Sequence, residues 1–175
     1  VSVEGAANLP YQIPNLLVDL HTPTDIGVPV LWWRSVGSTH TAFSTEIFID
    51  ELAVAANKDP VQFRLALLGK HPRHAGVLKL AAEQAGWGKP LAPGKAGERR
   101  GRGVAVHESF NTFVAEVAEV TVRADGSLTV DRVVVAVDCG VAVNPDVIRA
   151  QAEGSVGFAL SAVLYNQITL KDGAV

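Results

Sequence analysis

The segment from residue 88 to residue 102 divides the sequence into two parts with different hydrophobic periods. This segment, GKPLAPGKAGERRGR, holds four glycines, two prolines and a cluster of basic residues, a composition typical of a solvated linker. Apolar residues before it recur at helical spacing, whereas those after it alternate or run together as in strands. The sequence therefore predicts an α+β fold, with helices over about 41–86, a linker over 88–102, and a β meander plus a long helix over 103–175.

The part over residues 1–87 is expected to begin irregularly and then to form three helices. Closely spaced prolines prevent a long helix near the start, where short extended pieces such as NLLVDLH and VPVLWW are expected. Asp59 and Pro60 mark the N-cap and first residue of the second helix, and Gly86 ends the third. For the first helix, the expected caps are Ser38, Thr39 or Thr41, Glu46 suits the first turns, and the expected apolar face is Ile47, Leu52, Val54 and Ala55.

The part over residues 103–175 is expected to be a three-stranded meander followed by a helix. The runs GVAVHESF, TFVAEVAEVTV and SLTVDRVVVAVD are rich in β-branched residues, and a turn over 124–126 joins the last two. Asn144 and Pro145 then mark the N-cap and first residue of a long helix. Because the chain starts at Val1, has no methionine and stops in the turn sequence ITLKDGAV, we interpret it as a piece of a longer polypeptide, truncated at its C-terminus.

The composition excludes several classes of protein. The formal net charge of −3 gives no basic excess for binding nucleic-acid phosphates. No apolar run approaches the roughly 20 residues that cross a bilayer. A single cysteine, Cys139, excludes internal disulfides and multi-cysteine metal sites. Only His71 and His74 lie close together among the histidines, and without a third ligand beside them no metal site is expected.

Two segments have compositions that ordinary packing explains less well. WWRSVGS places Trp-Trp-Arg before a helix N-terminus, where unpaired N–H groups and partial positive charge favour an anion. The alternative there is a packed tryptophan pair with an arginine that caps a neighbouring carbonyl. VDCGVAVNPDVIRAQAEG places the Gln151 amide one to two turns inside a helix, beside Gly154, where it suits a polar heterocycle or a phosphate. The alternative for this segment is an ordinary strand-to-helix connection.

The chain resembles the molybdopterin-binding large subunit of the xanthine dehydrogenase and aldehyde oxidase family, in its isoquinoline 1-oxidoreductase beta-subunit type. The residues that carry the resemblance are WWRSVGSTHTAFSTEIFIDELA, KDPVQFRLALL and VDCGVAVNPDVIRAQAEGSVGFALSAVLY, and it runs over nearly the whole chain. The resemblance implies a bacterial oxidoreductase that hydroxylates N-heterocycles or aldehydes at a molybdenum centre held by molybdopterin cytosine dinucleotide. It also implies that electrons leave to [2Fe–2S] clusters on a separate small subunit, while the large subunit supplies binding and electrostatics.

The resemblance also implies roles for particular residues. Arg34 matches the arginine of the family's Arg-Gly-x-Gly turn beside the molybdenum site, and the rest of that turn is Ser35, Val36 and Gly37. Serine at 35 departs from the glycine of many members, as expected of the isoquinoline type. Asn144 and Gln151 match the Asn-Pro and Gln-x-Glu-Gly positions, where the glutamine lies against the pterin dinucleotide. No catalytic residue is assigned, because the family's glutamate base lies in a Gly-x-Gly-Glu motif beyond the end of this chain.

We therefore expect part of an enzyme that is inactive alone and whose partners are the remainder of the large subunit and the small [2Fe–2S] subunit. The alternative is a non-catalytic interaction or scaffold domain that kept the fold without the cofactor. Arg34 and Gln151 together favour the enzyme, since a decayed site has no reason to keep both. The sequence leaves the compartment open between the cytoplasm and the periplasm of a bacterium.

Overall fold

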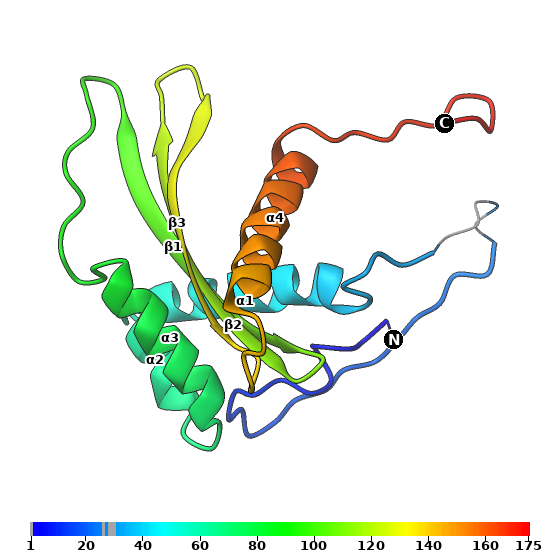
Figure 1. Ribbon diagram of the computed structural model, residues 1–175. Helices are drawn as coiled ribbons and strands as arrows, with labels where there is room; N and C mark the ends of the chain where they lie inside the picture. The colour runs from blue at the N-terminus through cyan, green and yellow to red at the C-terminus, as the bar shows by residue number, and fades with distance from the viewer. Residues whose placement is uncertain (1, 26, 28–30) are drawn as a thin grey trace. The chain divides into compact units, whose positions relative to one another are not determined.

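The computed structural model describes residues 2–25, 27 and 31–175, and the chain forms two compact units, Val1–Cys139 and Gly140–Val175. In chain order the elements are α1 (Ser38–Ala55), α2 (Pro60–Leu67), α3 (Pro72–Gln84), β1 (Arg99–Ser109), β2 (Thr112–Val122), β3 (Leu128–Asp138) and α4 (Pro145–Leu164). Helices thus precede a three-stranded sheet, and a long helix follows it (Figure 1). The fold is α+β, as the sequence predicts.

The sheet is an antiparallel meander in the order β1-β2-β3. Phe110 and Asn111 join the first two strands with φ angles of 52° and 60°, the left-handed pair that a two-residue hairpin turn requires. A turn over 124–126 joins the next two strands, and Gly126 adopts a φ of 83° there. This confirms the turn that the sequence predicts.

The core of the first unit lies between helix α3 and one face of the sheet. α3 contacts all three strands, and Figure 1 shows α2 and α3 together on one side of the sheet. The buried residues at this contact are small or branched and include Leu78, Ala81, Val104, Val106 and Val117. Strand residues that face the helices alternate with residues that face away, so the sheet has one covered and one uncovered face within this unit.

Local capping signals locate the second and third helices correctly. Asp59 Oδ1 accepts a hydrogen bond from the Gln62 N–H at 2.9 Å, and Pro60 is the first residue of α2. α3 ends at Gln84, and Gly86 follows with a φ of 65°, the left-handed conformation that closes many helices.

The first helix differs from the expectation in its cap and in its buried face. Its N-cap is Gly37, and no side chain caps it. The face that is buried is Ser38, Thr41, Glu46, Ile49 and Ala53. The expected apolar face is largely exposed, with Val54 74% accessible. The physical reason is that α1 carries apolar residues on several sides, and the partners of Glu46 decide which side turns inward.

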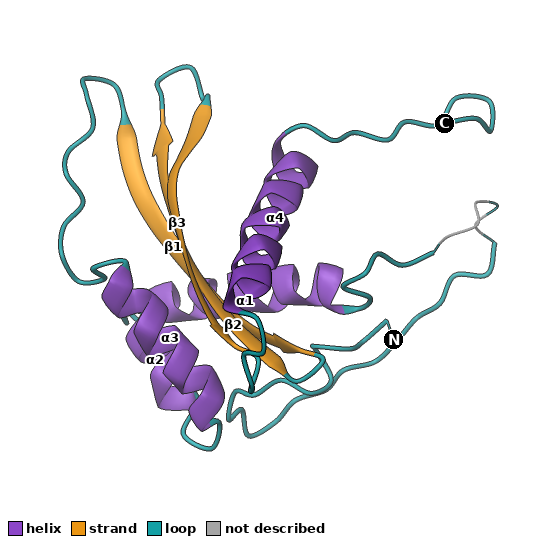
Figure 2. Ribbon diagram, in the orientation of Figure 1, coloured by secondary structure: helices purple, strands orange, loops and turns teal. Residues whose placement is uncertain are grey.

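The linker is shorter than expected, because β1 begins at Arg99. The basic residues that suggested a solvated segment have acidic partners across the sheet: Arg100 lies 3.5 Å from Asp131, and Arg102 lies 3.2 Å from Glu119. Residues 88–98 remain a loop that connects α3 to β1 (Figure 2).

The irregular start also agrees with the sequence where the structure describes it. Residues 2–25 contain turns and irregular backbone and no strand. The beginning of the extended piece expected over VPVLWW, residues 28–30, lies outside the described residues. None of the helices in the described part of the chain combines the length and the apolar content needed to cross a membrane.

Candidate functional site

The turn that precedes α1 is closed by its own backbone. The Val36 N–H donates to the Trp33 carbonyl at 2.9 Å, and Val36 adopts a φ of 51°. A β-branched residue with positive φ is uncommon and costs local strain. Thr39 Oγ1 donates to the Val36 carbonyl at 2.8 Å and lies 2.6 Å from Ser35 Oγ. These hydrogen bonds close the turn, and the Ser35 hydroxyl contributes to them through Thr39.

The N-terminal segment fixes the same turn from outside. The Gly37 N–H donates to Glu4 Oε2 at 3.2 Å, and Thr41 Oγ1 donates to the Glu4 carbonyl at 2.6 Å. Gly5 has a φ of 86°, and a Cβ there would lie 2.5 Å from Thr41 Oγ1 and 2.9 Å from His107 Cε1. Only glycine fits this close approach, which holds the start of α1 against the segment before it.

Arg34 differs from the other residues of this turn in its surroundings. Its side chain is exposed, and among the described residues no carboxylate or carbonyl pairs with the guanidinium. The neighbouring Trp32 and Trp33 are 63% and 50% accessible. An open groove of about 400 Å³ lies beside them, lined by Ser2, Leu31, Trp32, Trp33, Val36, Gly37, Thr39 and His40. The turn thus presents one uncompensated cation next to a partly aromatic groove.

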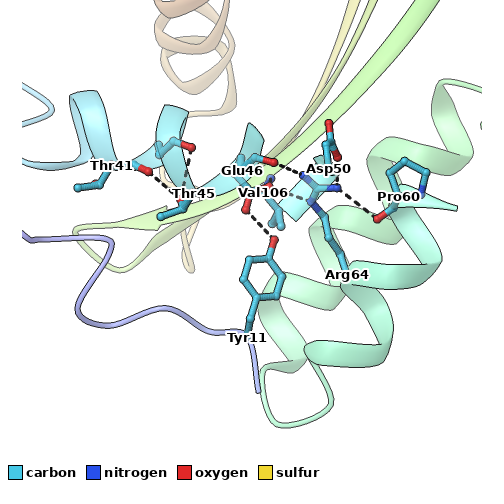
Figure 3. A network of polar contacts seen from close by, with 9 residues as sticks. Tyr11, Thr41, Thr45, Glu46, Asp50, Pro60, Arg64 and Val106 are labelled. Carbon is cyan, nitrogen blue, oxygen red and sulfur yellow. Dashed lines mark hydrogen bonds and ion pairs between the residues drawn. The ribbon is translucent and has the colours of Figure 1, made fainter. Parts of the chain in front are cut away.

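A buried polar network supports α1 about two turns further along. Glu46 accepts hydrogen bonds from Tyr11 Oη at 2.7 Å and from Arg64 Nε at 2.9 Å. The Arg64 side chain is fully buried, and it also pairs with Asp50. Glu46 Oε2 accepts a further bond from the Val106 N–H at 2.9 Å. Figure 3 shows these groups converging on Glu46 from the N-terminal segment, α2 and β1.

The surroundings shift the pKa values of two groups in this network. Burial is the largest single effect on Arg64 and would lower its pKa, but Glu46, Tyr11 and Asp50 together outweigh burial, so the pKa of Arg64 is raised. Burial, and then the nearby charge of Glu46, raises the pKa of Tyr11, so this phenol stays protonated and donates. Because Val106 belongs to an edge strand, the Glu46 carboxylate also satisfies a backbone N–H that no other strand pairs in this unit.

Sequence reasoning missed this network. It gave Glu46 only a place in the first turns of the helix, whereas Glu46 is buried and binds Arg64 and Tyr11. A signal was present: Glu46 lies in AFSTEIFI and Arg64 in VQFRLALL, each a lone charge among apolar residues. Two such charges of opposite sign on neighbouring helices are typical of a buried ion pair.

The second unit contains the other expected site residues. Asn144 Oδ1 accepts from the Asp146 and Val147 N–H groups at 3.1 and 3.2 Å, which confirms Asn144 as the N-cap of α4. The Gln151 side chain is exposed and has no hydrogen bond among the described residues; its backbone carbonyl accepts from Ser155 Oγ at 2.6 Å. Gln151 is therefore available for a ligand, whereas Asn144 is occupied by its own helix.

The candidate residues belong to two separate units of the structure. Arg34 and its turn belong to the unit Val1–Cys139, and Asn144 and Gln151 belong to the unit Gly140–Val175. The expectation that Arg34 and Gln151 line one site stays a prediction.

The histidine pair has a packing role. The His71 and His74 rings meet edge-on with centroids 5.4 Å apart, and His74 packs in the same way on Phe113 at 4.7 Å. Burial, followed by the charge of His71, lowers the pKa of His74 to about 4. The described part of the chain contains no group of three or more His, Cys, Asp or Glu residues placed to hold a metal.

Comparison with known proteins places this geometry in a family. Residues 71–175 match the molybdopterin cofactor-binding domain. The chain is 36% identical over 166 residues to the beta subunit of isoquinoline 1-oxidoreductase of Brevundimonas diminuta. The aligned region covers 94% of this chain and 21% of that protein. It is 36% identical over 179 residues to one of the subunits of nicotinate dehydrogenase of Pseudomonas putida, covering 95% of this chain and 15% of that protein.

A third relative is a membrane-bound aldehyde dehydrogenase [pyrroloquinoline-quinone] of Gluconacetobacter polyoxogenes, 33% identical over 157 residues, or 81% of this chain and 20% of that protein. The chain therefore spans about a fifth or less of the length of these relatives. The match over residues 71–175 covers more than half of the sequence and includes the sheet and the Asn144 helix. By this match the chain belongs to the molybdopterin cofactor-binding domain family.

Proposed function

We propose that the chain is part of the large subunit of a molybdenum hydroxylase, and that Arg34 and Gln151 contact molybdopterin cytosine dinucleotide. The observation that carries the proposal is the Arg34 guanidinium, which is exposed and has no ionic partner among the described residues, while its neighbours Trp33 and Val36 line an open groove in a chain of the cofactor-binding family. A cation in the turn just before a helix N-terminus suits a ligand with phosphate groups.

The residues present fit such a cofactor in two different ways. The Arg34 guanidinium and the Gln151 amide have no partners among the described residues, so both can bind phosphate or pterin atoms. Ser35 and Asn144 instead hold the backbone that carries them, through Thr39 and through the first turn of α4. Val36 and Gly37 shape and anchor the turn. We therefore assign Ser35, Val36, Gly37 and Asn144 as positioning residues.

When bound, the cofactor supplies oxidative hydroxylation of an electron-poor carbon in an N-heterocycle or aldehyde and passes electrons on to [2Fe–2S] clusters of a partner subunit. This chain contributes orientation and charge neutralisation. Two of the relatives are named as subunits, which supports an assembly with a separate subunit, and we propose that this partner carries the iron–sulfur clusters. The general base belongs to a Gly-x-Gly-Glu sequence that these 175 residues do not contain.

The test uses the full-length subunit, produced with its partner in molybdenum-replete cells. Arg34→Ala should lower the molybdenum content per subunit, since losing a charge-assisted hydrogen bond costs about 1.5–3 kcal/mol of binding free energy. Arg99→Ala is the matched control, because Arg99 is also exposed and has no ion pair among the described residues. If the wild-type complex contains no molybdenum, the protein is instead a scaffold that kept the fold.

A further inference from the structure

The sheet has an apolar face that no helix of its own unit covers. In β2, Ala115 and Val117 are buried under α3, whereas Val114, Glu116 and Ala118 point to the opposite side and are only partly buried. The strand register extends this second face sideways from the central strand. Its residues, called here the Glu116 face, are Ala105, Val114, Glu116, Ala118, Val133, Val135 and Val137.

Glu116 is the one charged side chain in the middle of this face. It pairs in register with Ala105 on one side and Val135 on the other. No described residue hydrogen bonds or ion pairs with its carboxylate. Burial raises the pKa of Glu116, and no charged group offsets that burial. The carboxylate therefore carries a desolvation cost that nothing in this unit offsets.

The other ionisable groups on this side of the strands do not place a positive charge near the Glu116 carboxylate. His107, opposite Val114, has a pKa lowered by burial, and the carboxylates acting on it are Glu46, Glu108 and Glu4. Arg99 lies at the far end of β1, opposite Val122, six residues from the position of Glu116. A strand rises about 3.3 Å per residue, so Arg99 is roughly 20 Å away along the sheet.

We propose that the Glu116 face is the docking surface for an apolar protein segment that carries one lysine or arginine and places it over Glu116. An apolar sheet face left open to water is unfavourable, and a cover of apolar groups alone would leave the carboxylate buried and unpaired. Charge complementarity therefore selects a cover with one cation at its centre. The proposal rests on the proposed function in one respect: the segment belongs to the remainder of the large subunit, since this chain spans about a fifth of its relatives.

The test compares Glu116→Gln and Glu116→Lys in the full-length subunit with its partner. Removing the carboxylate leaves the docked cation unpaired, so Glu116→Gln should lower the melting temperature by several degrees, and Glu116→Lys should lower it further through repulsion. Glu83→Gln is the matched control, because Glu83 is an exposed carboxylate on α3 without a described partner, and its melting temperature should not change. In the wild-type subunit, carbodiimide labelling should modify Glu116 far more slowly than Glu83.

Three results would overturn the proposal. Labelling of Glu116 as fast as Glu83 means that the face is open. A melting temperature that is unchanged or raised in Glu116→Gln means that the cover has no cation. Protection that appears only at high protein concentration means that a second copy covers the face. Wild-type labelling needs no variant to fold, and the molybdenum content, measured separately, reports on the proposed function without affecting these outcomes.

Discussion

Arg34 and Arg64 lie in the same compact unit, only 30 residues apart in the sequence, yet their surroundings are opposite. Arg64 is fully buried, with Glu46 and Asp50 as ionic partners. Arg34 is exposed, and no described residue offers it a carboxylate. Both follow an apolar or aromatic run, so the sequence around them does not separate the two cases.

The contrast distinguishes a charge that is paired within its own unit from a charge that we propose binds a ligand. All the partners of Arg64 are inside the chain, so its role is complete without any ligand. The charge on Arg34 has no counterpart among the described residues, and its neighbours Trp33 and Val36 line an open groove. A cation whose counterpart is missing points to a ligand or to another part of the longer protein.

The most direct challenge to this contrast is an assay of the 175-residue chain alone. Because we propose that the counterpart of Arg34 and the general base belong to other parts of the longer protein, we expect a colourless chain that contains no molybdenum and reduces no artificial electron acceptor with quinoline-type heterocycles or aldehydes. Removing a general base alone typically costs on the order of 10²–10⁴ in rate. Substrate-dependent dye reduction by the isolated chain, with molybdenum bound, would contradict the assignment.

Replacing Arg64 should have the next largest effect. Arg64→Ala leaves the Glu46 carboxylate buried without its cation, a change that typically costs about 3–5 kcal/mol of unfolding free energy. Arg34→Ala removes an exposed charge and should change the unfolding free energy by no more than about 0.5 kcal/mol. Urea unfolding of both variants, monitored by circular dichroism, measures the contrast.

A double replacement serves as the control for Arg64. Glu46→Leu with Arg64→Leu removes both charges, so the combined loss should be smaller than the sum of the single losses. Some loss remains, because the Val106 N–H and the Tyr11 hydroxyl lose their acceptor. Equal stability of Arg34→Ala and Arg64→Ala would remove the distinction between the two arginines.

The sequence predicts the parts of the fold that local chemistry decides. Asp59 with Pro60 and Asn144 with Pro145 begin their helices because a cap and a proline act over one turn. The buried face of α1 could not be predicted, since Glu46 turns inward only when Arg64 and β1 meet it. The start of β1 was misplaced for a similar reason: Arg100 and Arg102 resemble linker residues until Asp131 and Glu119 lie across from them.

For the candidate site, too, the sequence predicts some features and leaves others to the structure. The sequence, together with its resemblance to a family, identified the Arg34 turn and Gln151 as candidates. It did not show that the Ser35 hydroxyl bonds within the turn or that Asn144 Oδ1 accepts hydrogen bonds from its own helix, because hydrogen-bond partners depend on geometry. A side chain that hydrogen bonds to the backbone and a side chain that is free to bind a ligand cannot be told apart from the sequence.

Gln151→Ala tests the ligand side of the contrast. Losing an amide that pairs with buried polar cofactor atoms should cost about 1–3 kcal/mol of cofactor affinity. The full-length variant should therefore be purified with less molybdenum, while its cofactor-free melting profile stays normal because the Gln151 side chain bonds no described residue. Unchanged molybdenum occupancy would show that Gln151 is only a helix residue.

His74 extends the contrast to a buried base without an anionic partner. Arg64 keeps its charge on burial, whereas the pKa of His74 falls to about 4, from an ordinary value near 6.5. Between these values the unfolded chain binds a proton that the folded chain does not, so stability should fall as the pH falls from about 6.5 to 4, by roughly 3 kcal/mol. His74→Leu should flatten this dependence in urea titrations across the range. The raised pKa of Glu116 makes a contribution of opposite sign to the pH dependence of stability. This contribution is present in both the wild type and His74→Leu, so it cancels when the two are compared.

Tyr11→Phe should have the smallest effect and separates hydrogen bonding from charge in the Glu46 network. The substitution removes only the hydroxyl that donates to Glu46 Oε1 at 2.7 Å, and it keeps the buried ring and the ion pair. One hydrogen bond contributes about 1 kcal/mol net, so the unfolding free energy should fall by about that amount, well below the loss in Arg64→Ala. Leu9→Ala, at a partly buried position packed beside Tyr11 on the same core, is a control for packing in that segment. A loss in Tyr11→Phe equal to that of Arg64→Ala would mean that hydrogen bonding, and not the paired charge, holds Glu46 in place.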